Sequence, residues 1–271
     1  MTLKTRLAVA SLALGILGAG AAYAQDCTPK HEFTTISAGK LTVALTNTPP
    51  YSLEKDGTVS GIDGDLLKEF AKENCLEITY EIFTYPAAVS AVQTGRADVA
   101  IGGFYRTAAR DKVVTLSTPV YLDQLAVVSK EGYTKVDELL GKKVGTVEGY
   151  DWVMEMEDLF EGSTTYPSSL NLAQDLRAGR IDAALEGFGA AVVLNAGTDL
   201  KVKLLEADER VTATTQASQT SFLLSKTNTA FVDAMNASIE EYRGNGLIAK
   251  TLVEYGLDAS AADVGDARII E

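Results

Sequence analysis

The sequence predicts an α/β protein with two similar lobes on either side of a ligand cleft. The main observation is a motif that occurs twice. A helical stretch closed by Gly95-Arg96 precedes the mostly apolar stretch 97–101, and another closed by Gly179-Arg180 precedes the similar stretch 181–185, each with an aspartate at its second position. Glycine commonly ends a helix, and a short strand that is apolar on both faces is typical of a parallel sheet. Two such units favour two lobes; the alternative is one larger α/β domain that uses the unit twice.

The first part of the chain follows this pattern after an irregular tail at residues 25–37. The expected elements are a strand at 41–45, a turn at Thr48 to Tyr51, a hairpin between Gly57 and Gly61, a helix at 66–74, a strand at 78–83, a helix at 86–94 and a strand at 98–101. Asp63 is placed to cap the first of these helices. Thr107 begins another helix, and residues 120–128 form an apolar connector.

The same order of helices and strands then starts again in lobe two, and the chain finally returns to lobe one. The expected elements are a helix at 136–140, a strand at 143–147, a helix at 151–160, the second repeated unit, strands at 201–205 and 221–224, and helices at 230–243 and 247–255. We therefore predict mixed, mostly parallel sheets in a discontinuous lobe one at 38–125 and 221–260 and a lobe two at 126–220. The two chain crossings form a hinge that can close on a ligand.

The N-terminal residues 1–24 have the features of a secretory signal peptide. Lys4 and Arg6 precede an apolar stretch, and Ala22-Tyr23-Ala24 supplies the small residues of a cleavage site. A membrane anchor is the alternative, but the apolar run is shorter than the roughly 20 residues that a bilayer requires. Asp26 stands where lipid attachment at Cys27 would need a small residue, so we expect an exported protein without a lipid anchor.

Charge and cysteine content narrow the class further. The formal net charge of −13 argues against nucleic-acid binding and against attraction to anionic lipid. Cys27 and Cys75 are the two cysteines, and in an exported chain a disulfide between them is the default expectation. The alternative is two free thiols.

The sequence lacks the common signatures of catalysis, and we predict no metal and no cofactor. It contains no glycine-flanked nucleophile serine, phosphate loop, dinucleotide fingerprint or metal-spaced Cys/His cluster. The single histidine, His31, lies in the irregular tail, where we expect a solvated side chain. Asp63 and Asp65 lack the other ligands of a calcium loop and are expected to serve a helix start.

The segment after the first repeated strand is a candidate anion site. Thr107 is a good helix N-cap, and Arg110 falls in the first turn, where a basic residue is unfavourable next to the helix dipole. An anion held by backbone N–H groups and the guanidinium would explain it, and a carboxylate fits that geometry. The alternative is a surface arginine that pairs with a nearby acid.

The equivalent turn of lobe two runs from Gly149 to Trp152, and its N–H groups are placed to take the other side of the same anion. Trp152, Tyr85, Tyr105 and Tyr150 supply candidate apolar walls for a small ligand. Their alternative role is packing in the two cores.

With these residues in place, the chain resembles extracytoplasmic solute-binding proteins of the polar-amino-acid ABC importer family. The resemblance covers about residues 38–257 and rests on the order and spacing of several pieces: Pro50-Tyr51, the stretch 61–66, 95–98, Thr107 to Arg110, 141–145, Gly149 and 178–184. It implies the two-lobed, hinged fold known as periplasmic binding protein type II, closed around one small ligand.

The resemblance also implies roles for single residues. Arg110 would hold a ligand α-carboxylate, with help from the backbone N–H groups of Tyr105 and Asp151. The Gly103 carbonyl would face the ligand amine. Tyr85 would form one aromatic wall, while Trp152 lies on the lobe-two side.

Two departures from the family pattern bear on the ligand. The aromatic residue that many members stack on the ligand aligns with Thr48, which leaves Tyr51 as a displaced substitute. The acid that pairs with the ligand ammonium aligns with Gly187, and Glu186 precedes it on a strand, where a shift of one residue points to the other face. Glu148 is a second acid placed to meet a cationic ligand, or a solvated residue.

The sequence therefore predicts a monomeric periplasmic receptor, not an enzyme, that captures a small carboxylate-bearing, amino-acid-like solute and delivers it to an ABC importer permease in the inner membrane. Two alternatives stay open. One is a dehydratase-like enzyme on the same fold, with Glu186 or Glu148 as general acid. The other is a ligand sensor for a membrane receptor.

Overall fold

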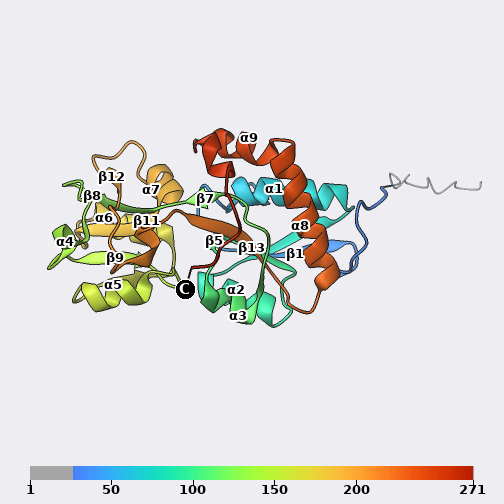
Figure 1. Cartoon of the computed structure of the whole chain (residues 1–271), viewed down its shortest axis with the longest axis horizontal. Helices are drawn as coiled ribbons and strands as arrows, with labels where there is room; N and C mark the ends of the chain where they lie inside the picture. Colours follow the sequence, from blue (N-terminus) through green and yellow to red (C-terminus); the bar gives the residue numbers. More distant parts are fainter. Residues whose placement is uncertain (1–26, 271) are drawn as a thin grey trace, which may run out of the picture.

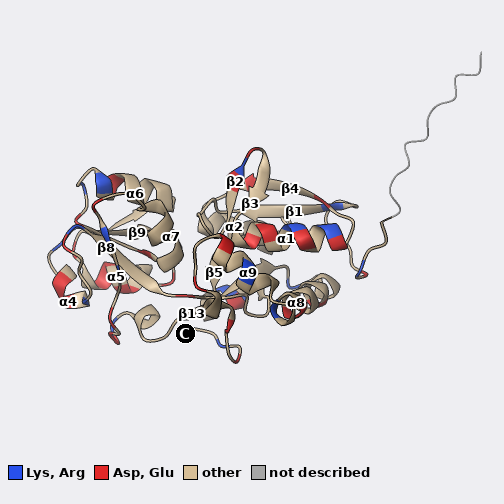
Figure 2. Cartoon of the chain, turned by 90° about the horizontal axis from the view of Figure 1, so that it is seen from above, with Lys and Arg blue, Asp and Glu red and all other residues tan. Residues whose placement is uncertain are grey.

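The computed structural model of the chain describes residues 27–270, so the signal peptide predicted at residues 1–24 lies outside it. Two α/β lobes lie side by side, each built around its own sheet, which confirms the predicted fold class (Figure 1). Acidic residues lie on both lobes (Figure 2). None of the helices between residues 27 and 270 combines the length and the apolar composition of a membrane span.

Lobe one contains a mixed sheet in the order β4-β1-β5-β13-β6, with β7 also paired to β13. Its strands are β1 (Lys40–Leu45), β4 (Glu77–Ile82), β5 (Val99–Tyr105), β6 (Thr115–Leu116), β7 (Leu122–Asp123) and β13 (Ser218–Leu224), and a separate hairpin joins β2 (Leu53–Lys55) to β3 (Thr58–Ser60). The helices of this lobe are α1 (Ile62–Glu73), α2 (Tyr85–Gln93), α3 (Ala108–Val113), α8 (Thr229–Gly244) and α9 (Leu247–Glu254), followed by the 3-10 turn η2 (Ala259–Ala262).

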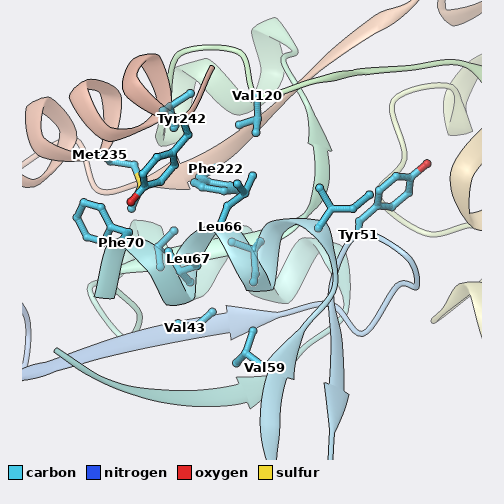
Figure 3. Close-up of a cluster of buried hydrophobic side chains, with 14 of the residues drawn as sticks. Val43, Tyr51, Val59, Leu66, Leu67, Phe70, Val120, Phe222, Met235 and Tyr242 are labelled. Carbon is cyan, nitrogen blue, oxygen red and sulfur yellow. The ribbon is translucent and has the colours of Figure 1, made fainter. Parts of the chain in front are cut away.

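The main core of lobe one lies between this sheet and the helices α1, α8 and α9. Leu66, Leu67 and Phe70 project from one face of α1, at the spacing that a helix needs to bury one side. They meet Phe222 of β13 in the same cluster (Figure 3). Tyr51 stands at the edge of this core, and its hydroxyl group points away from the other labelled side chains.

Lobe two contains a sheet in the order β10-β9-β11-β8-β12. Its strands are β8 (Leu125–Ser129), β9 (Val144–Val147), β10 (Thr164–Tyr166), β11 (Ala183–Gly187) and β12 (Lys201–Leu204). Its helices are α4 (Val136–Leu139), α5 (Val153–Leu159), α6 (Ser169–Arg177) and α7 (Phe188–Leu194), with the 3-10 turn η1 (Thr212–Thr214).

The two repeated units predicted from the sequence are present and occupy equivalent places. Gly95 follows α2 with φ 71°, and Gly179 follows α6 with φ 68°, which is the left-handed backbone that ends many helices. The strands that follow, β5 and β11, each lie between a parallel and an antiparallel neighbour. In both units an aspartate after the glycine accepts a backbone N–H from the start of the parallel neighbour, Asp98 from Thr42 and Asp182 from Lys143.

The sheets are mixed and mostly parallel in strand direction, as predicted. Parallel pairing joins β4, β1 and β5 in lobe one and β10, β9 and β11 in lobe two. One strand in each sheet runs the other way: β13 pairs antiparallel with β5, β6 and β7 in lobe one, and β8 pairs antiparallel with β11 and β12 in lobe two. β8 and β13 are reversed because each follows a chain crossing and enters its lobe from the side where the lobes meet.

The lobes are linked by two crossings that lie next to each other. The first runs through Gln124, between β7 and β8, and the second leads into β13 at Ser218. β7 and β13 pair at this point, with Asp123 opposite Ser218. The lobe limits predicted from the sequence, at residues 125/126 and 220/221, remain a prediction.

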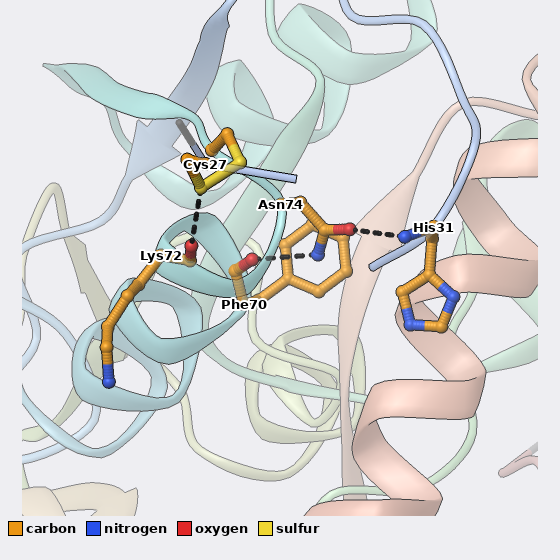
Figure 4. Close-up of a disulfide and its surroundings, with 6 residues drawn as sticks. Cys27, His31, Phe70, Lys72 and Asn74 are labelled. Atoms are coloured by element: carbon orange, nitrogen blue, oxygen red, sulfur yellow. Dashed lines mark hydrogen bonds between the residues drawn. A yellow bond between two sulfur atoms is a disulfide. The ribbon is translucent and has the colours of Figure 1, made fainter. Parts of the chain in front are cut away.

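The N-terminal tail is fastened to lobe one by the disulfide between Cys27 and Cys75, which closes a sequence separation of 48 residues (Figure 4). The backbone N–H of His31 donates to Oδ1 of Asn74 at 3.0 Å, and Nδ2 of Asn74 donates to the carbonyl oxygen of Phe70 at 2.8 Å. His31 is not the fully solvated tail residue that we expected: it is partly buried, and its ring lies 3.4 Å from the hydroxyl of Ser238.

Candidate ligand-binding site

A small pocket lies between the lobes at the carboxyl ends of β5 and β11. Nearly all of the predicted site residues line it, together with one residue that sequence reasoning missed. The lining consists of Tyr51, Tyr85, Gly103, Tyr105, Arg110, Asp123, Tyr150, Asp151, Trp152 and Gly187. Its free volume is about 10 Å³, close to what one water molecule needs. A solute can therefore enter only if the lobes separate.

The local sequence around Arg110 fixes its guanidinium in the pocket. The side chain of Thr107 caps α3 by accepting the backbone N–H of Arg110 at 3.3 Å, as predicted. The guanidinium donates to the carbonyl oxygen of Tyr105 at 2.6 Å and, across the cleft, to that of Gly149 at 2.9 Å. Burial lowers the pKa of this guanidinium, an effect that the nearby Asp151 carboxyl opposes. Arg110 is thus a buried cation rather than a surface residue paired with an acid.

Asp123, on the hinge strand β7, is the pocket residue that the sequence reasoning missed. Its Oδ2 accepts the hydroxyl of Tyr51 at 2.6 Å and that of Tyr105 at 2.7 Å. Burial raises the pKa of the Asp123 carboxyl, and the two hydroxyls oppose the rise. One signal was available in the sequence, because Asp123 is the only charged residue in the apolar run 120–128.

Tyr51 links this carboxylate to lobe two. Its hydroxyl accepts the backbone N–H of Gly189 at 2.9 Å while it donates to Asp123. Its ring stacks on Tyr121 with 5.9 Å between centroids. Gly187 and Gly189 come close to the same hydroxyl, and a Cβ at Gly189 would lie only 2.6 Å from it. Glycine at these positions therefore lets the hinge side of the two lobes meet.

The predicted aromatic walls pack in the hydrophobic clusters and also line the pocket, while their contact with a ligand stays a prediction. Tyr150 packs edge-on against Tyr85 across the cleft, at 5.0 Å between centroids, and against Trp152 at 4.9 Å. The indole N–H of Trp152 donates to Oγ1 of Thr146 at 2.8 Å. Tyr85 donates to the carbonyl oxygen of Gly102 at 2.5 Å, and burial raises its pKa to about 12.

The two glutamates considered for the site do not line the pocket. Glu186 is buried behind Tyr150, whose hydroxyl donates to its Oε1 at 2.5 Å, and its Oε2 has no hydrogen-bond partner among residues 27–270. Burial raises the pKa of Glu186 to about 7. Glu148 is half-buried, and its backbone N–H donates to Tyr166. Asp151, in contrast, does line the pocket, and burial raises the pKa of its carboxyl to about 6 although Arg110 opposes this.

Asp63 has a different role from the helix cap that we predicted. Gly61 is the N-cap of α1, and Asp63 lies one residue into the helix without capping it. Its Oδ2 accepts the backbone N–H groups of Gly102 and Gly103, both at 2.9 Å, and its Oδ1 accepts the hydroxyl of Tyr121 at 2.8 Å. The prediction was wrong because the carboxylate is engaged in these tertiary hydrogen bonds and not in a cap of its own helix. Asp63 thereby positions the end of β5, where Gly103 lines the pocket.

Two α/β lobes, two adjacent chain crossings and a pocket that both lobes line define a hinged solute-binding protein. The chain belongs to the bacterial extracellular solute-binding proteins, family 3, whose sequence profile matches residues 41–258. This family assignment agrees with the resemblance found in the sequence.

Individual relatives are similar over most of their length. The chain is 28% identical to the putative ABC transporter arginine-binding protein 2 of Escherichia coli (strain K12) over 203 residues, which are 73% of this chain and 82% of that protein. It is 29% identical to the L-cystine-binding protein TcyJ of the same strain over 219 residues, 78% of this chain and 80% of that protein. Among solved structures, the amino acid ABC transporter substrate-binding protein AbpA of Streptococcus pneumoniae bound to L-arginine aligns with a TM-score of 0.71 and 27% identity, covering 83% of this chain and 96% of that one.

Proposed function

We propose that this protein is the periplasmic substrate-binding component of an ABC importer and captures a small, carboxylate-bearing, amino-acid-like solute. The single observation that carries the proposal is the buried, fixed guanidinium of Arg110, which faces a pocket lined from both lobes. A guanidinium is the side chain best suited to bind a carboxylate through two parallel hydrogen bonds. The relatives support the same class, because they are named for binding arginine and cystine.

Closure of the lobes is the proposed binding step. Two of the five N–H groups of Arg110 are engaged by Tyr105 and Gly149. The donors that remain can bind a ligand carboxylate, which the backbone N–H groups of Tyr105 and Asp151 would share. Such a ligand would touch both lobes, so it favours the closed form over the open one. A ligand shifts a two-state equilibrium only through such differential affinity.

Delivery to an inner-membrane permease follows from this class of protein and needs no bond-making step. We propose that the receptor acts as a monomer. The dehydratase alternative requires a carboxylic acid in contact with the ligand. Glu186 has the raised pKa of a general acid, but Tyr150 stands between it and the pocket, and Glu148 does not line the pocket either. The geometry therefore supports binding without chemistry.

Isothermal titration calorimetry tests the proposal. The purified protein would be titrated with the common L-amino acids, L-cystine and simple carboxylates such as succinate. We expect saturable binding of at least one amino acid and none of an amine that lacks a carboxylate. Folded protein that binds no member of the panel would overturn the proposal, and turnover of prephenate would replace it with the enzyme alternative.

A further inference from the structure

The pocket holds an anion as well as a cation, and the anion comes from the hinge. Arg110 and Asp123 both line the pocket, and no ion pair within 4.0 Å joins Asp123 to a basic side chain among residues 27–270. The neighbours of the Asp123 carboxylate are instead two tyrosine hydroxyls and two backbone N–H groups. A buried carboxylate without a cationic partner is costly, so this position favours a ligand that carries positive charge.

The carboxylate of Asp123 occupies the space that a side chain at position 187 would fill. A Cβ built on Gly187 would lie 2.5 Å from Oδ2 of Asp123, 3.2 Å from the hydroxyl of Tyr51 and 3.5 Å from that of Tyr105. The backbone of Gly187 has φ −59° and ψ 139°, which any residue can adopt. Glycine is therefore not required there by the backbone. It is required because the carboxylate of Asp123 and its two tyrosine partners fill that space.

We propose that Asp123 binds the α-ammonium group of the solute and thereby makes this receptor specific for zwitterions. The proposal rests on the function inferred above and names its ligand more closely, as an α-amino acid with both head groups charged. Arg110 takes the carboxylate and Asp123 takes the ammonium. Tyr51 and Tyr105 hold the Asp123 carboxylate in place through Oδ2.

The position of Asp123 also couples ammonium binding to closure. Asp123 is the last residue of β7, directly before the first crossing, and its Oδ1 lies 3.4 Å from the backbone nitrogen of Gly189 in lobe two. Tyr51 makes the second contact of this kind, because its hydroxyl bonds both Asp123 and Gly189. A cation bound to Asp123 therefore lies at the hinge, about which the two lobes rotate.

The test compares ligands that differ only in the α-ammonium group. The pairs are L-arginine and 5-guanidinopentanoate, L-histidine and imidazole-4-propionate, and L-glutamine and 4-carbamoylbutanoate, measured by calorimetry. For a pair whose amino acid binds, the wild-type protein should prefer the amino acid by about 100-fold or more, because its partner leaves Asp123 unpaired. In Asp123→Asn we expect that preference to fall by about tenfold or more, while the affinity for the desamino acid stays constant or rises.

A matched control separates a general loss of structure from this effect. Asp98→Asn changes another buried aspartate of lobe one that accepts two backbone N–H groups and lies outside the pocket. It should keep the wild-type preference. An equal loss of affinity for both members of a pair in Asp123→Asn would overturn the proposal and assign Asp123 a purely structural role.

A second variant transfers the carboxylate from the hinge strand to lobe two. Asp123→Ala combined with Gly187→Asp places a carboxylate on the strand end whose space Asp123 now fills. It should restore the preference for the amino acid over its desamino partner; an unchanged low preference would contradict the spatial equivalence of the two positions. Should Asp123→Asn fail to fold, the crystal structure of the wild-type complex decides, and an ammonium nitrogen that makes no hydrogen bond to Asp123 overturns the proposal. These outcomes differ from failure of the proposed function, in which the wild-type protein binds no amino acid at all.

Discussion

The guanidinium of Arg110 in lobe one donates a hydrogen bond to the carbonyl oxygen of Gly149 in lobe two, 2.9 Å away. The residue proposed to hold the ligand carboxylate therefore also bridges the closed cleft. The carbonyl of Gly149 belongs to the turn between β9 and α5, and the preceding strand β9 is the neighbour of β11 in the lobe-two sheet. In the proposed binding mode, ligand binding and the contact between the lobes thus depend on the same few atoms.

The first prediction concerns Arg110 itself. Arg110→Ala should weaken binding of the tightest amino acid found by calorimetry by about 100-fold, because hydrogen bonds to charged groups contribute roughly 1.5–3 kcal/mol each. Arg110→Lys should recover only part of the loss, since an ammonium group cannot form two parallel bonds to a carboxylate. Arg96→Ala, at an exposed arginine of the same lobe, is the control and should bind normally. A dissociation constant that barely moves in Arg110→Ala would place the site elsewhere.

The second prediction concerns closure. A Cβ on Gly149 would lie 2.9 Å from Cδ of Pro86 and 3.2 Å from Cβ of Tyr85, both in lobe one. Gly149→Ala should therefore hold the lobes apart, weaken ligand binding and increase the radius of gyration measured by small-angle X-ray scattering with ligand present.

Gly141→Ala separates this clash from backbone strain. Gly141 has a φ of 71°, similar to the 79° of Gly149, but a Cβ there would meet nothing within 4 Å. Both variants should lose about 1 kcal/mol or more of stability from the left-handed backbone. Only Gly149→Ala should impair closure. Normal ligand-induced compaction in Gly149→Ala would show that the closed form tolerates the side chain.

Local patterns in the sequence predicted the parts of this fold that local physics decides. Gly95 and Gly179 end helices, and Thr107 caps α3, because each of these roles depends on the residue and its nearest neighbours in the chain. The repeated order of helix, glycine and strand then followed. Element ends differed by a few residues, as at β13, which begins at Ser218 rather than at the predicted residue 221.

The parts that the sequence did not predict depend on contacts between distant segments. Asp63 has the position of a helix cap, yet its carboxylate bonds to β5, nearly forty residues away in the chain. In the sequence, Asp123 is a single acidic residue in the apolar connector 120–128. The pairing of β7 with β13 brings it to the pocket. The direction of Glu186 was left open by its strand position, and Tyr150 decides it by hydrogen bonding.

The third prediction is a dependence of stability on pH that originates at Glu186. Its folded pKa is about 7, above the usual 4.5, because burial disfavours the charged form. The folded state therefore binds a proton that the unfolded state has released, so this contribution is fully present below pH 4.5 and is lost as the pH rises through about 7. The full difference is roughly 3 kcal/mol.

Urea unfolding from about pH 4 to about pH 8 measures this effect. Glu186→Gln, which mimics the protonated acid, should match the wild type at the acidic end and exceed its stability at the basic end. Tyr150→Phe should move the loss to higher pH, because the tyrosine hydroxyl favours the charged carboxylate. Parallel pH profiles for the wild type and Glu186→Gln would show that Glu186 keeps an ordinary pKa in the folded protein.

The fourth prediction separates stability from binding. The disulfide between Cys27 and Cys75 closes a sequence separation of 48 residues, so the chain-entropy account gives a loss of about 4 kcal/mol for Cys27→Ser combined with Cys75→Ser. Ligand affinity should stay near the wild-type value, because the disulfide joins the tail to the end of α1 that lies far from lobe two (Figure 1). Reduced wild-type protein should unfold like the double variant. A large loss of affinity at unchanged stability would contradict this assignment.

The last prediction concerns the C-terminal residues, which lie beyond the region that matches the family profile. Ile270 pairs with the segment just before Arg110: its N–H donates to the carbonyl oxygen of Arg106 at 2.9 Å, and its carbonyl oxygen accepts the N–H of Ala108 at 2.8 Å. Its side chain packs against the lobe-two core. This tail therefore supports the turn that carries Arg110 and contacts both lobes where they meet (Figure 1).

Removal of residues 269–271, which leaves Arg268 in place, should lower the free energy of unfolding by about 2 kcal/mol, since the two backbone hydrogen bonds of Ile270 contribute about 1 kcal/mol each. It should also weaken ligand binding, because the turn before Arg110 loses its support. Ile269→Ala is the matched control: that side chain is 40% exposed, and the change leaves the backbone pairing of Ile270 intact. Denaturant unfolding and calorimetry on the two variants measure both effects. If the shortened chain binds as tightly as the full one, Arg110 holds its position without the tail.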